Sequence, residues 1–240
     1  MKISLIHPSR GRAEIAHKTY RNWIDKSSGK IEIEYLLSND FYDESLKKYQ
    51  DLFLNSQDKN GNYANCNMAN NNNLVEATNN GAKMCNGNLI VLISDDFDCP
   101  ENWDLILLDA VKGKKDFVLK TFDGIQDWIV TLPIMDRIYY EKQGYIYYPE
   151  YQHMFCDTDM THKAHLEGKL IVRNDLVFTH NHYSIGKSEK DYINTKADLT
   201  WQQGEKVYLE RVKNNFGIKK EEIKPFELPL EMQKWINSKI

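Results

Sequence analysis

The chain has 240 residues, more than the roughly 150 residues of an average domain and enough to bury a large core without disulfides. Hydrophobic residues make up 41 % and aromatic residues 12 %, which argues against an intrinsically disordered chain. The net charge of −4 lacks the basic excess of a general nucleic-acid binder, so we expect no nucleic-acid partner.

Neither a membrane span nor a secretion signal is predicted. The longest aliphatic run, Leu89 to Ile93, is far shorter than the roughly 20 residues that cross a bilayer. Lys2 is followed by only four residues before His7 and Pro8, too few for a signal segment. The four cysteines show no CxxC spacing, which favours reduced thiols over a zinc or disulfide framework. We therefore expect a soluble, cytoplasmic protein.

The first half of the chain alternates between strand and helix patterns. Positions 60–88 contain 12 asparagines, but small and apolar residues recur there at helical spacing. The five aliphatic residues at 89–93 are typical of a strand that is covered on both faces. In chain order we predict a strand over 2–6, a helix from 13 to about 26, a strand over 31–37, a helix over 72–85, a strand over 89–93 and a helix over 103–111. This order predicts an α/β fold with a mostly parallel central sheet flanked by helices.

The second half shows a weaker alternation. We predict strands over 116–122, 128–132, 170–172 and 176–179, and a helix over 159–167. Residues 187–240 are charged and mostly helical in pattern, and we interpret them as a helical C-terminal extension.

Three carboxylates, Asp95, Asp96 and Asp98, directly follow the most apolar strand. Ligands of open α/β sheets bind at the carboxyl ends of the strands. Carboxylates packed this closely repel each other unless a cation compensates, and oxygen ligands suit Mg²⁺ or Mn²⁺. A solvated turn that caps the helix starting near Asn102 is the alternative.

A known signature surrounds this loop. Residues 79–96 read N-x-G-x-x-x-C-x-G-N-L-I-V-L-I-S-D-D, which resembles the motif of GT-A glycosyltransferases of the family-two type. The resemblance implies a DXD-like loop in which Mn²⁺ or Mg²⁺ bridges the donor's diphosphate. It implies that Asp96 and Asp98 bind the metal ion and that Asp95 faces the ribose or the sugar of the donor. Two registers of this motif remain open.

The same resemblance implies a donor site at the ends of the first two strands, which in these enzymes cradle the nucleotide. Arg10 and Arg12 can pair with phosphate through their planar forks, although ordinary loop solvation is the alternative. The donor-binding residues implied are Pro8, Ser9, Arg10, Arg12, Asp40, Asn79, Asp95 and Asp96.

The segment from Phe155 to Lys169 resembles the family's acceptor-side motif, with Cys156 where the family often has Glu. On this match Asp157 is the catalytic base and Asp159 the acid at the helix start. A sugar hydroxyl is a poor nucleophile and needs a carboxylate within about 3 Å to accept its proton. A structural N-cap is the alternative for these aspartates.

Two histidines and the segment before the acceptor-side motif contain further candidate site residues. His180 and His182 share one side of an extended segment, and the resemblance places one of them on the metal. Asp136 and Arg137 are implied acceptor contacts. Trp128 is a further acceptor candidate, although core packing is the favoured interpretation of the aromatic residues.

The leading hypothesis is a metal-dependent, inverting glycosyltransferase that moves a hexose from a UDP-sugar to a hydroxyl of a glycan or other acceptor. We expect a GT-A catalytic domain over 1–186, with a nucleotide-sugar half at 1–100 and an acceptor half at 101–186, followed by the extension at 187–240. A nucleotidyltransferase, a zinc hydrolase using His153, His180, His182 and Asp157, and a non-catalytic carbohydrate-binding protein are the alternatives.

Overall fold

A seven-stranded sheet forms the centre of the computed structural model, which describes residues 1–239. Its strands are β1 (Lys2–Pro8), β2 (Glu32–Asp40), β3 (Asn65–Ala69), β4 (Leu89–Leu92), β6 (Val118–Phe122), β7 (Ile134–Asp136) and β8 (Leu170–Val177), in the spatial order β3-β2-β1-β4-β7-β6-β8. Only β7 runs antiparallel to its neighbours. The predicted α/β fold with a mostly parallel sheet is therefore confirmed.

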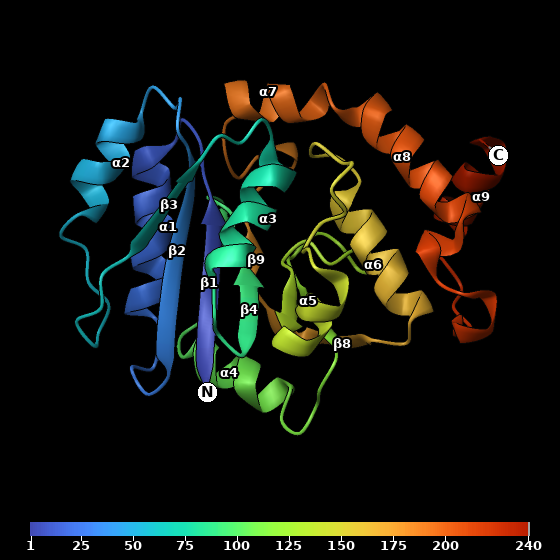
Figure 1. Ribbon diagram of the computed structural model, residues 1–240, viewed down its shortest axis with the longest axis horizontal. Helices are drawn as coiled ribbons and strands as arrows, with labels where there is room; N and C mark the ends of the chain where they lie inside the picture. The colour runs from blue at the N-terminus through green and yellow to red at the C-terminus, as the bar shows by residue number, and fades with distance from the viewer. Residues whose placement is uncertain (240) are drawn as a thin grey trace.

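Helices cover both faces of this sheet (Figure 1). They are α1 (Ala13–Asp25), α2 (Leu46–Phe53), α3 (Leu74–Met84), α4 (Trp103–Ala110), α5 (Arg137–Gln143), α6 (Cys156–Leu166), α7 (Tyr192–Asp198), α8 (Trp201–Lys213) and α9 (Leu230–Lys239), with short 3-10 turns at Tyr183–Ile185, Asn215–Gly217 and Lys220–Glu222. One buried cluster includes side chains of α1, α2 and α4, and a second includes side chains of α3, α5, α6, α8 and α9.

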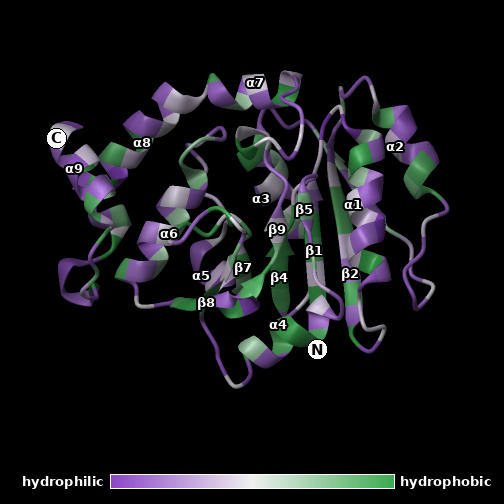
Figure 2. Ribbon diagram, turned by 180° about the vertical axis from the view of Figure 1, so that it is seen from behind, coloured by the Kyte–Doolittle hydropathy of each residue, from purple (hydrophilic) through white to green (hydrophobic). Residues whose placement is uncertain are grey.

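The central strands are apolar on both faces because each face meets one of these clusters. Leu5 of β1 packs into the first cluster, and its neighbour Ile6 packs into the second. Figure 2 shows β1 and β4 as a hydrophobic centre between helices with hydrophilic outer faces. The continuous apolar run at 89–93 therefore belongs to a strand buried on both sides.

Two glycines of the 79–96 motif allow close packing against β1. A Cβ at Gly81 would lie 2.9 Å from Ile6 Cγ2, and a Cβ at Gly87 would lie 2.5 Å from Ser4 Oγ. Any larger residue would push α3 or the turn before β4 away from the sheet. These glycines thus fix the approach of the chain to β4 and to the acidic loop after it.

The structure differs from the predicted elements at several places. Residues 128–132 form an irregular loop rather than a strand, because the Asp123 carboxylate binds the Ile125 and Gln126 N–H groups and the Thr131 hydroxyl. Residues 170–177 form one strand, not two. The edge strand β3 and the short helix α2 were not predicted, since residues 65–69 are polar and largely exposed.

The residues after 186 form helices that pack against the rest of the chain. Val207, Tyr208 and Ile236 belong to the second buried cluster, and a Cβ at Gly204 would lie 2.2 Å from the Met154 carbonyl oxygen. Figure 1 places α7 across the end of the sheet at which β1 and β4 terminate. The domain boundary at residue 186 stays a prediction.

Between residues 1 and 239, no helix has both the length and the apolar character that crossing a bilayer requires.

Candidate active site

The carboxyl ends of β1 and β4 meet in a buried hydrogen-bond network around Asp95. His7 Nε2 lies 2.9 Å from Asp95 Oδ1, and the Ser9 hydroxyl donates to the same oxygen over 2.8 Å. The Thr19 hydroxyl donates to the Asp95 carbonyl oxygen over 2.6 Å and connects α1 to the loop. Asp95 is only 8 % exposed. Its carboxylate therefore joins the two strand ends.

Tyr49 of α2 extends this network to the loop after β1. The Arg12 backbone N–H donates to the Tyr49 hydroxyl over 3.0 Å, and this hydroxyl lies 2.7 Å from Ser9 Oγ. Because Ser9 donates its proton to Asp95, Tyr49 donates to Ser9. The chain of donors thus runs from Arg12 through Tyr49 and Ser9 to Asp95, and it fixes the backbone of residues 9–12.

Two carboxylates after β2 hold the same loop from the other side. Arg10 Nη1 lies 3.1 Å from Asp40 Oδ2, and the Gly11 N–H donates to Asp43 Oδ2 over 2.8 Å. Gly11 has a φ of +68°, a left-handed conformation that favours glycine. The predicted donor loop is therefore held in shape by residues of the chain itself.

Asp96 is the carboxylate of the acidic loop that faces His180. Ser94 Oγ donates to Asp96 Oδ1 over 2.6 Å, and His180 Nε2 lies 3.2 Å from Asp96 Oδ2. The other ring nitrogen, Nδ1, lies 3.6 Å from Asp123 Oδ2. Burial alone would lower the pKa of His180, but the neighbouring carboxylates of Asp123 and Asp96 raise it to about 9. His180 is thus an imidazolium between two carboxylates.

The charge of His180 acts in turn on both carboxylates. Although burial opposes the change, His180 lowers the pKa of Asp96 well below its usual range and that of Asp123 to about 2. Asp96 keeps 23 % of its side chain exposed. Among the three aspartates after β4, Asp96 is therefore the partly exposed carboxylate that contacts His180.

A second, two-stranded sheet brings His180 to this loop. Strand β5 (Phe97–Asp98) pairs antiparallel with β9 (Thr179–His180), and the His180 ring stacks on Phe97 with 4.3 Å between centroids. Asn181 donates from its side chain to Asp98 Oδ2 over 2.9 Å. The structure therefore brings Asp96 and His180 together, while Asp98 has Asn181 as its partner.

His182 lies beside His180, with 4.9 Å between ring centroids. Its Nδ1 lies 2.7 Å from Ser184 Oγ rather than near a carboxylate. Burial and the charge of His180 lower its pKa.

Asp157 lies in the first turn of α6, whose start is set by an unusual backbone conformation. Phe155, the N-cap residue, has a φ of +70°, which is rare for a bulky side chain. Its ring packs against Trp201 and Trp235, with centroids 4.9 and 5.6 Å away, and this packing compensates the strain. Burial raises the pKa of Asp157, whereas the Thr158 N–H bond and the charge of His180 oppose the rise.

His153 precedes this turn. Burial and the charge of Arg12 lower its pKa to about 4, while Asp198 and Asp96 act in the opposite direction. His153 thus lies close enough to Arg12, Asp96 and Asp198 for their charges to shift its pKa. A neutral His153 is therefore expected at physiological pH.

Comparison with known protein families identifies the family of this chain. Residues 4–188 match the family model described as "Glycosyl transferase family 2". The chain belongs to this family. Among curated proteins, no relative matches the chain.

Solved structures share the fold at low identity. The mannosyltransferase PcManGT from Pyrobaculum calidifontis, in complex with GDP-Man and Mn²⁺, is 11 % identical with a TM-score of 0.60, over 99 % of this chain and 68 % of that one. S. aureus TarS is 15 % identical with a TM-score of 0.58, and its complex with UDP-GlcNAc is 15 % identical with 0.60, each over 99 % of this chain and 79 % of the other. The predicted GT-A fold is confirmed, and the chain is a glycosyltransferase.

Two of the residues that the family resemblance singled out, Asp159 and Asn79, form hydrogen bonds with other parts of the chain. Asp159 accepts hydrogen bonds from Arg211 Nε over 2.8 Å and from the Tyr151 hydroxyl over 3.1 Å. The Asn79 side chain binds the backbone of Ile146 and Tyr147 and thereby attaches the loop before α6 to α3. Neither side chain is brought to the group around Asp96.

Asp136 and Arg137 lie at the edge of the sheet opposite Asp96, and their role as acceptor contacts stays a prediction. Asp136 pairs with Leu89, the first residue of β4, because β7 runs antiparallel. Its carboxylate caps α5 by accepting from the Tyr139 N–H, and Arg137 donates to the Gly87 carbonyl oxygen. Trp128 is half-buried in the loop after β6.

Asp96 and its neighbours are the residues of this region that could hold a metal ion. Within residues 1–239, no three His, Cys, Asp or Glu side chains are arranged as a ready-made metal site, including the four residues of the zinc alternative. Mg²⁺ and Mn²⁺ are often held by one or two carboxylates, with substrate phosphate and water as the other ligands. A partly exposed Asp96 beside an imidazole fits that requirement.

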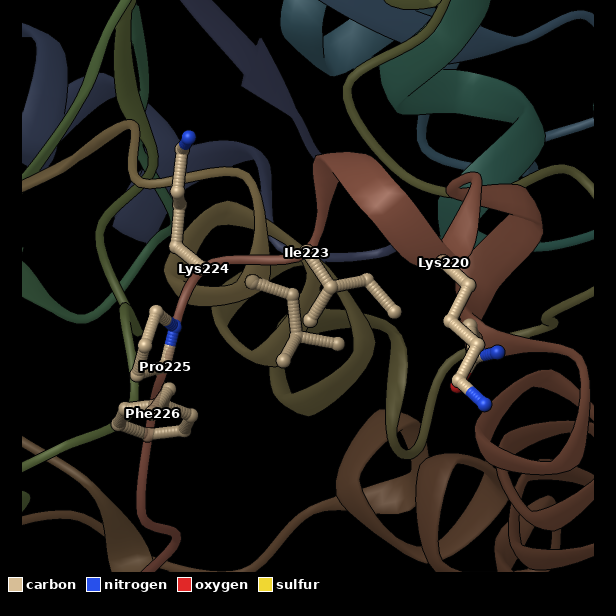
Figure 3. Close-up of a pocket in the computed structure, with 7 residues that line it drawn as sticks. Lys220, Ile223, Lys224, Pro225 and Phe226 are labelled. Carbon is tan, nitrogen blue, oxygen red and sulfur yellow. The ribbon is translucent and has the colours of Figure 1, made fainter.

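A surface cavity of about 430 Å³ lies elsewhere (Figure 3). It is lined by Leu166, Asn215, Lys220, Ile223, Lys224, Pro225 and Phe226. Leu166 ends α6, about 14 Å along the helix axis from Asp157 at 1.5 Å per residue. The cavity is therefore separate from the group around Asp96.

Asp123, Asp43 and Tyr49 are among the residues of this region that sequence reasoning missed. Asp123 directly follows β6 and precedes Gly124, so a strand followed by Asp-Gly was an available signal. Asp43 and Tyr49 lie in or near the unpredicted helix α2, and no local pattern connects them to the loop after β1.

Proposed function

We propose that this family 2 glycosyltransferase transfers a hexosyl group from a nucleotide-diphospho-sugar to a hydroxyl group of a glycan or similar acceptor. The observation that supports this most directly is the pairing of Asp96 with His180 at the carboxyl ends of β1 and β4. Strand ends of this kind bind ligands in open α/β sheets. We propose UDP-sugars as the first donor class to test.

The donor would occupy the edge formed by the loops after β1, β2 and β4. Arg10 and Asp40 lie at the outer part of this edge, where Arg10 is about half exposed and can meet an anionic or polar group. Asp95, Ser9 and Tyr49 keep the loop backbone in place. Binding therefore requires little reorganisation of the loops, which favours affinity.

Asp96, with His180 beside it, is the proposed ligand for Mn²⁺ or Mg²⁺. A cation bound there supplies Lewis-acid stabilisation of the negative charge that develops on the departing diphosphate. His180 can serve as a ligand only in its neutral form, so cation binding competes with the proton that this imidazole carries. Asp98 at the end of β5 and His182, two residues after the end of β9, are further candidates.

Asp157 is the proposed general base of a single inverting displacement. Its carboxylate would accept the proton of the acceptor hydroxyl while this oxygen attacks the anomeric carbon. The bond between that carbon and the diphosphate oxygen breaks in the same step. Burial, which raises the pKa of Asp157, makes its ionised form a better proton acceptor than an exposed aspartate.

A panel of nucleotide sugars tests the proposal. We expect release of the nucleoside diphosphate from one or more donors, UDP-hexoses first, and stimulation by Mn²⁺ or Mg²⁺. Slow donor hydrolysis without an acceptor would separate an enzyme from a carbohydrate-binding protein. A chain that releases no diphosphate from any donor, with and without metal, would contradict the proposal.

A further inference from the structure

The guanidinium group of Arg12 is held by the C-terminal extension. Nε and Nη2 of Arg12 each lie 2.6 Å from a different carboxylate oxygen of Asp191, and Nη2 also donates to Asn194 Oδ1 over 3.0 Å. Asp191 and Arg12 are 179 positions apart in the sequence. Two parallel bonds from a planar guanidinium to one carboxylate fix its orientation as well as its position.

Asp191 and Asn194 are themselves fixed by a capping box at the start of α7. The Asn194 N–H donates to Asp191 Oδ1 over 2.9 Å, and the Asp191 N–H donates to Asn194 Oδ1 over 3.0 Å. In addition, Ile193 reaches towards the loop after β1, where its Cδ1 lies 3.8 Å from a Cβ built on Gly11. The partner of Arg12 is thus an ordered helix start rather than a free surface side chain.

These contacts leave one nitrogen of Arg12 for a ligand. Within residues 1–239, Nη1 makes no hydrogen bond, and its closest acidic neighbour, Asp95 Oδ2, lies 3.7 Å away. Burial alone would lower the pKa of Arg12, but Asp191, Asp95 and Asp96 raise it. A permanently charged N–H group therefore faces the loop that carries Asp96.

We propose that Asp191 is a positioning residue that holds Arg12 so that Nη1 contacts the diphosphate of the nucleotide-sugar donor. Donor affinity then depends on the C-terminal extension. This inference rests on the proposed function, because it needs a donor diphosphate near Asp96. Asp191 and Asn194 lie outside residues 4–188, so the family match does not include them.

Binding of simple nucleotides tests the inference without an acceptor. Isothermal titration in MnCl₂ would compare UDP, GDP, uridine and guanosine on the full chain and on Asp191→Asn. We expect Asp191→Asn to weaken diphosphate binding about 5- to 30-fold, because hydrogen bonds to charged groups are strong. Affinity for the nucleoside alone should change less than about twofold, whereas a collapsed loop would weaken both. Asp191→Glu should restore part of the diphosphate affinity.

Asp198→Asn is the matched control. Asp198 lies on the same helix and pairs with Lys190 and the Tyr183 hydroxyl, not with Arg12. It should bind the diphosphate like the unaltered chain, with a similar thermal midpoint. If Asp191→Asn fails to fold, Asn194→Ala, which removes one bond to Arg12, takes its place in the comparison.

The outcomes separate this inference from the proposed function. If the unaltered chain binds neither UDP nor GDP, both are wrong. If it binds one of them and Asp191→Asn binds it equally well, or loses nucleoside and diphosphate affinity in the same proportion, only the inference is wrong.

Discussion

His180 and Asp96 are 84 positions apart in the sequence, and in the folded chain His180 Nε2 lies 3.2 Å from Asp96 Oδ2. Asp123, on the other side of the same imidazole, lies 3.6 Å from Nδ1. The two carboxylates together keep His180 protonated. This imidazolium supplies positive charge beside the acidic loop.

Stability should fall as the pH rises from about 6.5 to about 9. The pKa of His180 is raised from 6.5 to about 9, so its contribution is complete below 6.5 and is lost as the pH rises through 9. The shift corresponds to about 3 kcal/mol of unfolding free energy. Urea denaturation across this range should show the decline in the unaltered chain and a flatter dependence in His180→Gln.

His182→Gln is the control for this measurement. His182 bonds to Ser184 and its pKa is lowered, so it is neutral between pH 6.5 and 9 and its replacement should leave the decline in this range as it is. If both variants showed the same pH dependence of stability, His180 would not be the group that causes the decline.

Asp96 and Asp98 should differ in their effect on metal-dependent binding. Asp96 is partly exposed beside His180, whereas Asp98 accepts a hydrogen bond from Asn181. We expect Asp96→Asn to abolish the gain in UDP or GDP affinity that Mn²⁺ produces, a loss of about tenfold or more. Asp98→Asn should retain most of that gain. If titration calorimetry showed instead that Asp98→Asn loses this gain and Asp96→Asn keeps it, Asp98 would be the metal ligand.

Asp157→Asn should separate chemistry from donor binding. Without a carboxylate to accept the hydroxyl proton, kcat should fall about 10²- to 10⁴-fold. Donor affinity should change less than about twofold, since the donor is expected at the loops after β1 and β4. Steady-state rates and titration of the same preparation would measure both values. Unchanged turnover would exclude Asp157 as the base.

Asp159→Asn should affect stability rather than catalysis. The change leaves Arg211 buried without its carboxylate partner, which costs about 2–4 kcal/mol of unfolding free energy. Activity per folded molecule should remain close to that of the unaltered chain. Asp175→Asn, which breaks an exposed pair with Arg173, serves as a control and should leave the unfolding free energy nearly unchanged. A large loss of kcat in folded Asp159→Asn would instead show that Asp159 has a catalytic role.

Local patterns were enough for the centre of the fold. The apolar run at 89–93 predicted a buried strand, the helical spacing over 72–85 predicted a helix, and the acidic loop predicted a ligand-binding edge. The structure contains the first two features and places Asp96 at that edge. Such features are readable because burial on both faces and backbone contact restrict the residue types at each position.

Strand direction could not be read in the same way. Residues 134–136 form β7, whose antiparallel course carries Asp136 and Arg137 to the edge opposite Asp96. A three-residue strand has too short a pattern to reveal its direction, and only its pairing with β4 and β6 decides it.

The sequence by itself determined which kinds of side chain follow β1 and β4, and with them the family. Tertiary structure alone decided their roles: Asp95 is buried by His7 and Ser9, while Asp96 faces His180. It likewise brought Asp191 to Arg12 from a distant part of the chain. Adjacent aspartates are equivalent in a sequence, because their charge is the same. They become different only when folding gives each its own partners, burial and pKa.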